Sequence, residues 1–350
     1  MKRRTFLAAA GTGAVALAGC IETADDNGER DDDTLVVATY SSFLDAPSIS
    51  PGEWVKEEFE EETGAELVWQ SPPGEVTHFI QRKQEDVSID ADLYLGVNTD
   101  ELVRVDEELD ESLFVEAPDI EGTEEIRSGL AFDPEERAIP YSTGYISLVY
   151  DSTATDAPET FEGLLEEDHS GELIAQNPGT STTGLAFLLH TIHEYGEDEY
   201  LDFWADLQDN DTTILGSWDD AYGAWMAGEA PMVVSYSTDQ VFAAQEGADL
   251  DQHQIRFLND QAYANPEGMA MFEGANEALA EEFMEFILRP DVQGEIAEQN
   301  VAFPATENAD LPEDYDDLAH EPPEPVTFAY DELVGSLDDW VDDWERQIAG

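Results

Sequence analysis

The chain has 350 residues, with 83 Asp and Glu against 13 Lys and Arg, and its formal net charge at pH 7 is −70. Such a charge destabilises a compact state by self-repulsion in dilute buffer, whereas at molar salt a Debye length of about 3 Å screens it. The composition therefore indicates a high-salt habitat, and the absence of a basic patch in the sequence argues against nucleic acid as a partner.

Residues 1–20 are predicted to be an export signal. Basic Lys2, Arg3 and Arg4 precede an apolar stretch that is too short to span a bilayer. The Arg pair followed by Thr-Phe-Leu resembles a twin-arginine signal, and Leu-Ala-Gly-Cys resembles a lipobox. We therefore expect Cys20, the only cysteine in the chain, to become a lipid anchor at the outer face of the cytoplasmic membrane. Residues 21–33 are expected to form a disordered acidic tether.

From Thr34 onward, short apolar runs alternate with amphipathic stretches, as in an α/β fold whose mostly parallel sheet is covered on both faces. The length suits two lobes of ordinary domain size. The expected strands of the first part are 35–39, 65–69, 91–96 and 139–150, and the expected helices are 54–62, 74–86 and 99–109. The last strand is long enough to carry the chain from one lobe to the other.

The second part of the chain repeats the alternation. Strands are expected near 173 and at 212–215, 231–236 and 268–272, and helices at 160–167, 184–195, 198–207, 218–226, 238–246, 277–288 and 291–299. Segment 307–325 is rich in Pro and acidic residues, so we expect it to be irregular. Apolar residues at helical spacing between Leu333 and Ile348 predict a final helix that docks onto the core.

Residues 177–186, Asn-Pro-Gly-Thr-Ser-Thr-Thr-Gly-Leu-Ala, follow a short apolar run and precede a helical pattern. They predict a strand, a tight loop and a helix N-terminus, whose unpaired N–H groups and partial positive charge suit an oxyanion. The hydroxyls of Thr180, Ser181 and Thr182 are candidate ligand contacts there. The alternative is a plain helix start with Thr182 or Thr183 as N-cap.

No motif in the sequence demands an enzyme. Gly179 and Gly184 have the spacing of a phosphate loop, but Leu185 stands where such a loop needs Lys. Ser181 lacks the Gly-x-Ser-x-Gly elbow of serine hydrolases. His190 and its neighbours do not form the His-Glu-x-x-His pattern of zinc proteases. We therefore expect a binding protein without a metal or cofactor.

Aromatic residues stand at corresponding places in the predicted elements. Tyr40 ends the first strand, Trp218 and Tyr222 open the helix after strand 212–215, and Tyr236 ends the next strand. In open α/β sheets, the carboxyl ends of strands and the neighbouring helix starts face the ligand crevice. These four residues are therefore predicted to share one site, where aromatic rings can stack on a flat or cationic ligand.

Several blocks, taken together, resemble the thiamine-binding solute receptors of ATP-driven (ABC) importers. The blocks are Val-Ala-Thr-Tyr-Ser-Ser-Phe at 37–43, Ala-Asp-Leu-Tyr-Leu-Gly at 91–96, Pro-Tyr-Ser-Thr-Gly-Tyr-Ile-Ser-Leu-Val-Tyr-Asp at 140–151, the loop at 177–185, Gly-Ser-Trp-Asp-Asp-Ala-Tyr-Gly at 216–223 and Ser-Tyr-Ser-Thr at 235–238. The resemblance runs over nearly the whole chain after the signal and implies a two-lobe periplasmic-binding-protein fold that closes on its ligand. Residues 34–141 and 238–325 would form lobe 1, residues 142–237 lobe 2, and residues 326–350 the C-terminal docking helix.

The resemblance also implies the ligand and its contacts. A lipid-anchored, monomeric receptor would capture thiamine and its phosphates outside the cell and deliver them to a membrane permease. The central loop would face the alcohol or phosphate end, and Tyr40, Trp218 and Tyr236 would line the thiazolium and pyrimidine site. The chain departs from the family pattern at Pro73, where the family has Asp, and Glu75 is expected to take over that role.

Two alternatives remain open from the sequence. A receptor of the same fold could bind ferric iron through the phenol oxygens of Tyr40, Tyr145 and Tyr236. A secreted hydrolase could use Ser181 as its nucleophile, although the sequence identifies no base for it.

Overall fold

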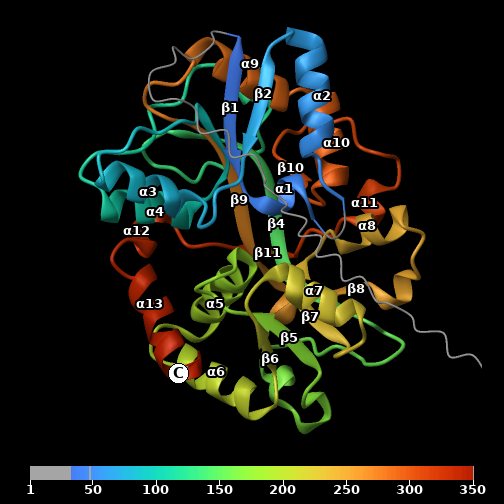
Figure 1. Cartoon of the computed structure of the whole chain (residues 1–350). Coiled ribbons are helices and arrows are strands. Elements are labelled where there is room, and N and C mark those ends of the chain that lie inside the picture. Colours follow the sequence, from blue (N-terminus) through green and yellow to red (C-terminus); the bar gives the residue numbers. More distant parts are fainter. Residues whose placement is uncertain (1–32, 47–48, 350) are drawn as a thin grey trace, which may run out of the picture. The chain divides into compact units, whose positions relative to one another are not determined.

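The structure is a computed structural model that describes residues 33–46 and 49–349 (Figure 1). The predicted signal, Cys20 and all of the predicted tether except its last residue lie outside the described residues. In the described part of the chain, no helix is both long enough and apolar enough to pass through a membrane.

The strands follow the order β2-β1-β3-β9-β4-β7-β5-β6, and β8, β10 and β11 pair at the sides of this path. Strand β1 is parallel to β2 and β3, and β5 is parallel to β6 and β7. The strand bounds are β1 Thr34–Thr39, β2 Glu66–Gln70, β3 Leu93–Val97, β4 Ala138–Tyr150, β5 Leu173–Gln176, β6 Thr213–Leu215, β7 Met232–Tyr236, β8 Gln254–Arg256, β9 Gln261–Met271, β10 Phe303–Pro304 and β11 Glu324–Val326. The α/β fold class is confirmed, with a parallel array on each side of a central pair.

The central pair, β4 and β9, is antiparallel and lies between the two arrays (Figure 1). Strand β4 pairs with β9 from Ala138 to Tyr145 and with β7 from Ile146 to Tyr150. The sequence predicted only the end of β9, near 268–272, because Asn265, Pro266 and Glu267 interrupt its apolar pattern.

The helices are α1 Ser41–Leu44, α2 Gly52–Thr63, α3 Val76–Gln84, α4 Thr99–Glu108, α5 Thr182–Tyr195, α6 Tyr200–Asp209, α7 Trp218–Met226, α8 Asp239–Gln245, α9 Glu277–Ile287, α10 Pro290–Gln299, α11 Tyr315–Leu318, α12 Tyr330–Leu333 and α13 Leu337–Trp344. Their ends follow local chemistry. A capping box of Asn98 and Glu101 starts α4, and left-handed Gly64 ends α2. The helix predicted at 160–167 is wrong, because that segment forms two short 3-10 helices, Glu162–Leu165 and Glu167–His169.

Separate apolar clusters fill the two sides of the central pair. One cluster joins β1, β2 and β3 to α2 and α9, with Phe59 and Phe283 fully buried. Another joins β4, β5 and β7 to α5, α6 and the C-terminal segment. Such separate cores are what two packed halves of one chain require.

The C-terminal segment packs on α5 and α6, but not as one helix. Gly335, with φ of +77°, interrupts it, so that α12 and α13 are separate and a π-helical turn, Glu345–Ala349, follows. Trp344 is fully buried and meets Trp204 edge to face, with ring centroids 5.3 Å apart. The predicted irregular segment 307–325 contains α11 and the start of β11.

Candidate functional site

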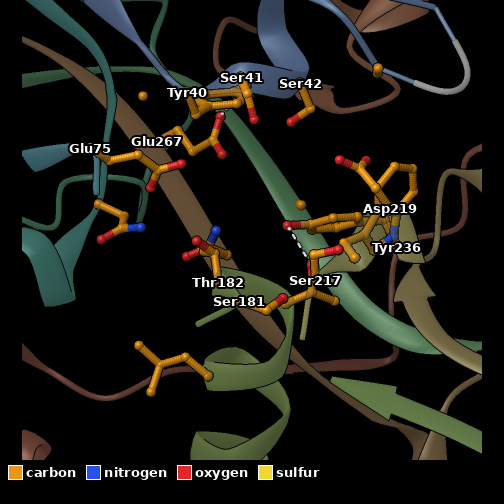
Figure 2. A pocket seen from close by; sticks show the side chains of 18 of the residues that line it. Tyr40, Ser41, Ser42, Glu75, Ser181, Thr182, Ser217, Asp219, Tyr236 and Glu267 are labelled. Carbon is orange, nitrogen blue, oxygen red and sulfur yellow. Dashed lines mark hydrogen bonds between the residues drawn. The ribbon is translucent and has the colours of Figure 1, made fainter. Parts of the chain in front are cut away.

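A cavity of about 760 Å³ lies where the end of β1, the middle of β4, the loop before α5, the start of α7 and the end of β7 meet. Figure 2 shows it from close by. All eight ligand contacts predicted from the sequence are among the residues that line it, namely Tyr40, Glu75, Thr180, Ser181, Thr182, Trp218, Tyr222 and Tyr236. Their shared location agrees with the prediction from strand ends and helix starts, although their roles remain a proposal.

Two tyrosine rings of the cavity lie directly on glycines of the sheet. A Cβ atom on Gly96 would come within 2.5 Å of the Tyr40 ring, and one on Gly144 within 2.7 Å of the Tyr236 ring. Contacts that short do not occur, so only glycine allows either ring to rest against the strand. The Tyr236 ring therefore packs directly on the backbone of Gly144, the glycine that interrupts the apolar run of β4.

The start of α7 builds an aromatic wall. Ser217 caps this helix by accepting a hydrogen bond from the Asp220 N–H. The Trp218 ring stacks on Tyr222 with centroids 4.9 Å apart and an interplanar angle of 23°, and its Nε1 donates to Ser235 Oγ at 3.0 Å. Stacking and this hydrogen bond fix the indole plane against the cavity.

A buried network of Asp239 and His253 fixes Tyr222 of this wall. The Tyr222 hydroxyl donates to Asp239 Oδ1 at 2.6 Å, and Asp239 Oδ2 lies 2.7 Å from His253 Nδ1. Asp239 and His253 are both buried. Burial and the neighbouring carboxylate raise the pKa of Tyr222, so its hydroxyl keeps its proton as the donor.

The loop before α5 has the predicted strand–loop–helix form, with a different cap. Ser181 is the N-cap, and its Oγ accepts from the Gly184 N–H at 3.3 Å, so the expectation of Thr182 or Thr183 as cap is wrong. Thr180 donates its hydroxyl hydrogen to the Gly216 carbonyl at 2.7 Å. The hydroxyl oxygens of this loop and the helix N-terminus face the cavity from one side, opposite Tyr40 and Glu75 (Figure 2).

Glu267 on β9 is a cavity residue that sequence reasoning missed. Its Oε2 accepts from the hydroxyls of Tyr40 at 3.1 Å, Tyr141 at 2.9 Å and Ser142 at 3.1 Å. Burial raises the pKa of Glu267, the three donors oppose this, and nearby Glu75 adds to the rise. No sequence signal marked Glu267, because one glutamate among so many acidic residues does not stand out.

Glu75 stands just before α3 in a strained backbone conformation, with φ of +51°. Burial raises the pKa of Glu75, Asp100 adds to the rise, and Arg104 opposes it. Arg104 is the one basic side chain among the described residues that line the cavity. The floor around Glu75 and Glu267 is therefore electronegative and suits a cation or an N–H donor.

The residues that a ferric iron receptor or a Ser181 hydrolase would use do not come together in the cavity as the predicted thiamine contacts do. Tyr145 is absent from the cavity lining and packs on Phe303 instead, with ring centroids 5.2 Å apart. The described part of the chain holds no group of three or more His, Cys, Asp or Glu side chains that suits a metal ion. No histidine lies among the described lining residues, so Ser181 has no imidazole base there.

Comparison with known proteins agrees with this geometry. The family model of bacterial extracellular solute-binding proteins matches residues 54–323. A thiamine-binding periplasmic protein of Brucella suis biovar 1 (strain 1330) is 31% identical over 324 residues, which cover 89% of this chain and 91% of that protein. The solved structure of a periplasmic thiamin binding protein is similar with a TM-score of 0.79 at 25% identity, over 92% of this chain and 98% of that one.

A ferric binding protein from Campylobacter jejuni shares the fold, with a TM-score of 0.72 at 18% identity over 89% of this chain and 99% of that one. The family match over residues 54–323 and the Brucella relative, together with this fold and cavity, make the chain a solute-binding protein. The chain belongs to the family of bacterial extracellular solute-binding proteins.

The contact between the Tyr236 ring and Gly144 can be tested by Gly144→Ala. The added methyl group would meet the ring at 2.7 Å, so we expect the free energy of unfolding to fall by about 1–3 kcal/mol. Gly223→Ala in α7 is the control, since a Cβ there has nothing within 4 Å. Denaturant unfolding at molar salt measures both, and equal stability of the two variants would contradict the contact.

The raised pKa of Glu267 predicts a pH dependence of stability. Because its folded-state pKa lies above 4.5, the folded chain binds more protons than the unfolded chain between the two values. The free energy of unfolding therefore falls as the pH rises through this interval. We expect a shallower fall in Glu267→Gln than in wild type or in Glu281→Gln, an exposed control on α9. Denaturant unfolding over a pH series checks this, and equal slopes in all three proteins would refute it.

Proposed function

We propose that this chain is the substrate-binding component of an ABC importer that captures thiamine and its phosphates outside the cell. The observation that carries the proposal is one cavity that combines fixed aromatic rings, the carboxylates of Glu75 and Glu267, and a hydroxyl-rich helix N-terminus. Thiamine is a flat organic cation with an alcohol arm, and each of its parts has a counterpart in that cavity. The names of the relatives point to the same ligand.

The order of the counterparts suggests how the ligand lies. The alcohol or phosphate end belongs beside Ser181 and Thr182, where backbone N–H groups and hydroxyls of the loop before α5 can donate hydrogen bonds to its oxygens. The thiazolium belongs between the loop and the aromatic wall, where Trp218 and Tyr236 offer ring faces to a cation. The pyrimidine then reaches the side of Tyr40 and Glu75 (Figure 2).

Residues 34–141 with 238–325 and residues 142–237 act, in this proposal, as two lobes that close on the ligand. The separate apolar clusters support this division, and β4, which pairs with β9 and then with β7, is the connection that bends. The chain binds and releases its ligand unchanged, as the binding proteins it resembles do, and it works as a monomer that delivers the ligand to a permease.

The family is extracellular, and we propose that this member is exported and held by lipid on Cys20. Such an anchor would keep the receptor near its permease. The acidic surface, with a formal net charge of −70, fits a receptor that works at high salt.

Calorimetry at molar salt tests the ligand. We expect thiamine to bind the wild type, and Trp218→Ala to weaken binding by about 1–3 kcal/mol because it removes a stacking face. Met226→Ala is the control, since Met226 lies on the same helix and is 55% exposed. Absence of heat with both thiamine and its phosphates would contradict the proposal. Full affinity in Trp218→Ala would contradict stacking of the ligand on Trp218.

The anchor is tested separately. Cys20→Ala should release the protein from the membrane fraction into the medium, because the lipid attachment atom is lost. Mass spectrometry of the N-terminal peptide of the wild type should show a lipid-modified Cys20. An unmodified Cys20, or a wild type found in the medium, would contradict the anchor.

A further inference from the structure

Three hydroxyl groups hold one carboxylate oxygen of Glu267 in place, and the other oxygen remains available to accept a hydrogen bond. The residues that hold it come from separate parts of the chain, since Tyr40 follows β1 and Tyr141 and Ser142 lie on β4. A β-bulge makes this possible, because the register of β4 on β9 shifts between Pro140 and Ser142. The consecutive side chains of Tyr141 and Ser142 therefore both reach the same carboxylate.

All three of these hydrogen bonds end on Oε2 of Glu267. Within the described part of the chain, no group donates to Oε1, and the residue lines the cavity. Asn300 donates to the Tyr40 hydroxyl at 2.8 Å, which leaves the Tyr40 proton for Glu267. One oxygen is thus fixed by the protein, and the other is held in a set direction for a ligand.

The charge around Glu267 calls for a donor from outside the protein. Glu75 lies close enough to disfavour its ionised form, and the donors that hold Glu267 are neutral hydroxyls. Glu267 is half-buried, and a carboxylate in such a place without a cationic partner is stabilised by a ligand that brings an N–H group or a positive charge. Figure 2 shows Glu267 and Glu75 on the same side of the cavity as Tyr40, away from Ser181 and Thr182.

We propose that Oε1 of Glu267 determines specificity by accepting a hydrogen bond from the exocyclic amine of the ligand's aminopyrimidine. This inference rests on the proposed function and on the ligand direction that the loop before α5 sets. An analogue with a carbonyl oxygen in place of the amine would put acceptor against acceptor. The receptor is therefore built to reject it, because the carboxylate would lose its donor and face a second lone pair.

The experiment measures the affinities for thiamine and for oxythiamine, its 4-oxo analogue, by calorimetry at molar salt. Wild type and the exposed control Glu281→Gln should both prefer thiamine by about 10- to 100-fold, the range of a charged hydrogen bond. Glu267→Gln should bind thiamine more weakly and lose most of the preference, because an amide can donate to the carbonyl as well as accept from the amine.

Ser142→Ala tests whether any damage to this cluster gives the same result. It removes one donor to Oε2 and leaves the carboxylate, so the preference for thiamine should remain. A wild-type preference retained in a folded Glu267→Gln would overturn the inference alone, whereas a wild type that binds neither compound would overturn the proposed function as well. If Glu267→Gln does not fold, Glu267→Asp takes its place, because it keeps the charge and withdraws the carboxylate from the ligand by one methylene. Loss of most of the preference in Glu267→Asp would support the inference, and a wild-type preference would overturn it.

Discussion

Strand β4 changes partners halfway along its length, and the cavity is built at that point. Residues up to Tyr145 pair with β9, and residues from Ile146 pair with β7. The last residue of β7, Tyr236, consequently lies over Gly144, and Glu267 on β9 lies beside Ser142. The pairing of the backbone strands therefore places the Tyr236 ring and the Glu267 carboxylate at the cavity. The hydroxyl loop and the aromatic wall are added to this frame by the neighbouring helix starts.

The acidic composition and the buried carboxylates have separate consequences. Surface charges lie in solvent, where molar salt screens them within about 3 Å. Glu75 and Glu267 are each half-buried in the cavity, so salt screens their effect on a bound ligand less. Recognition in a salt-rich medium should therefore depend on contact inside the cavity, with little help from long-range attraction of a cationic ligand. This agrees with a site in which fixed rings and one directed oxygen do the selecting.

Sequence reasoning reached the site through regular features. The strand ends and helix starts were visible as apolar runs followed by small or aromatic residues, so Tyr40, Trp218 and Tyr236 were expected at one site, and all three line the same cavity. Glu267 could not be found in this way, since its role depends on a bulge in β4 and on the pairing of strands distant in sequence. The cap was misplaced by one or two residues, because each of several consecutive hydroxyl residues can cap a helix, although Ser181 is of the type preferred over Thr.

For the fold, too, the sequence predicted regular elements and missed features that depend on tertiary pairing. Parallel strands such as β3 are buried throughout and read as continuous apolar runs. Strand β9 was recognised only at its end, since its middle carries Asn265, Pro266 and Glu267 next to the cavity. The single predicted final helix is divided at Gly335, where an exposed Val334 precedes a left-handed glycine. Local pattern thus predicted the regular elements, and it failed where tertiary pairing or backbone geometry decides.

The central claim is that this cavity accepts one organic cation with aromatic rings and a terminal alcohol or phosphate. Native mass spectrometry of the protein purified gently from its own cells tests it most directly. The account predicts an adduct with the mass of thiamine or of one of its phosphates, lost on unfolding. An adduct with the mass of ferric iron, or of an uncharged or purely anionic solute, would contradict it.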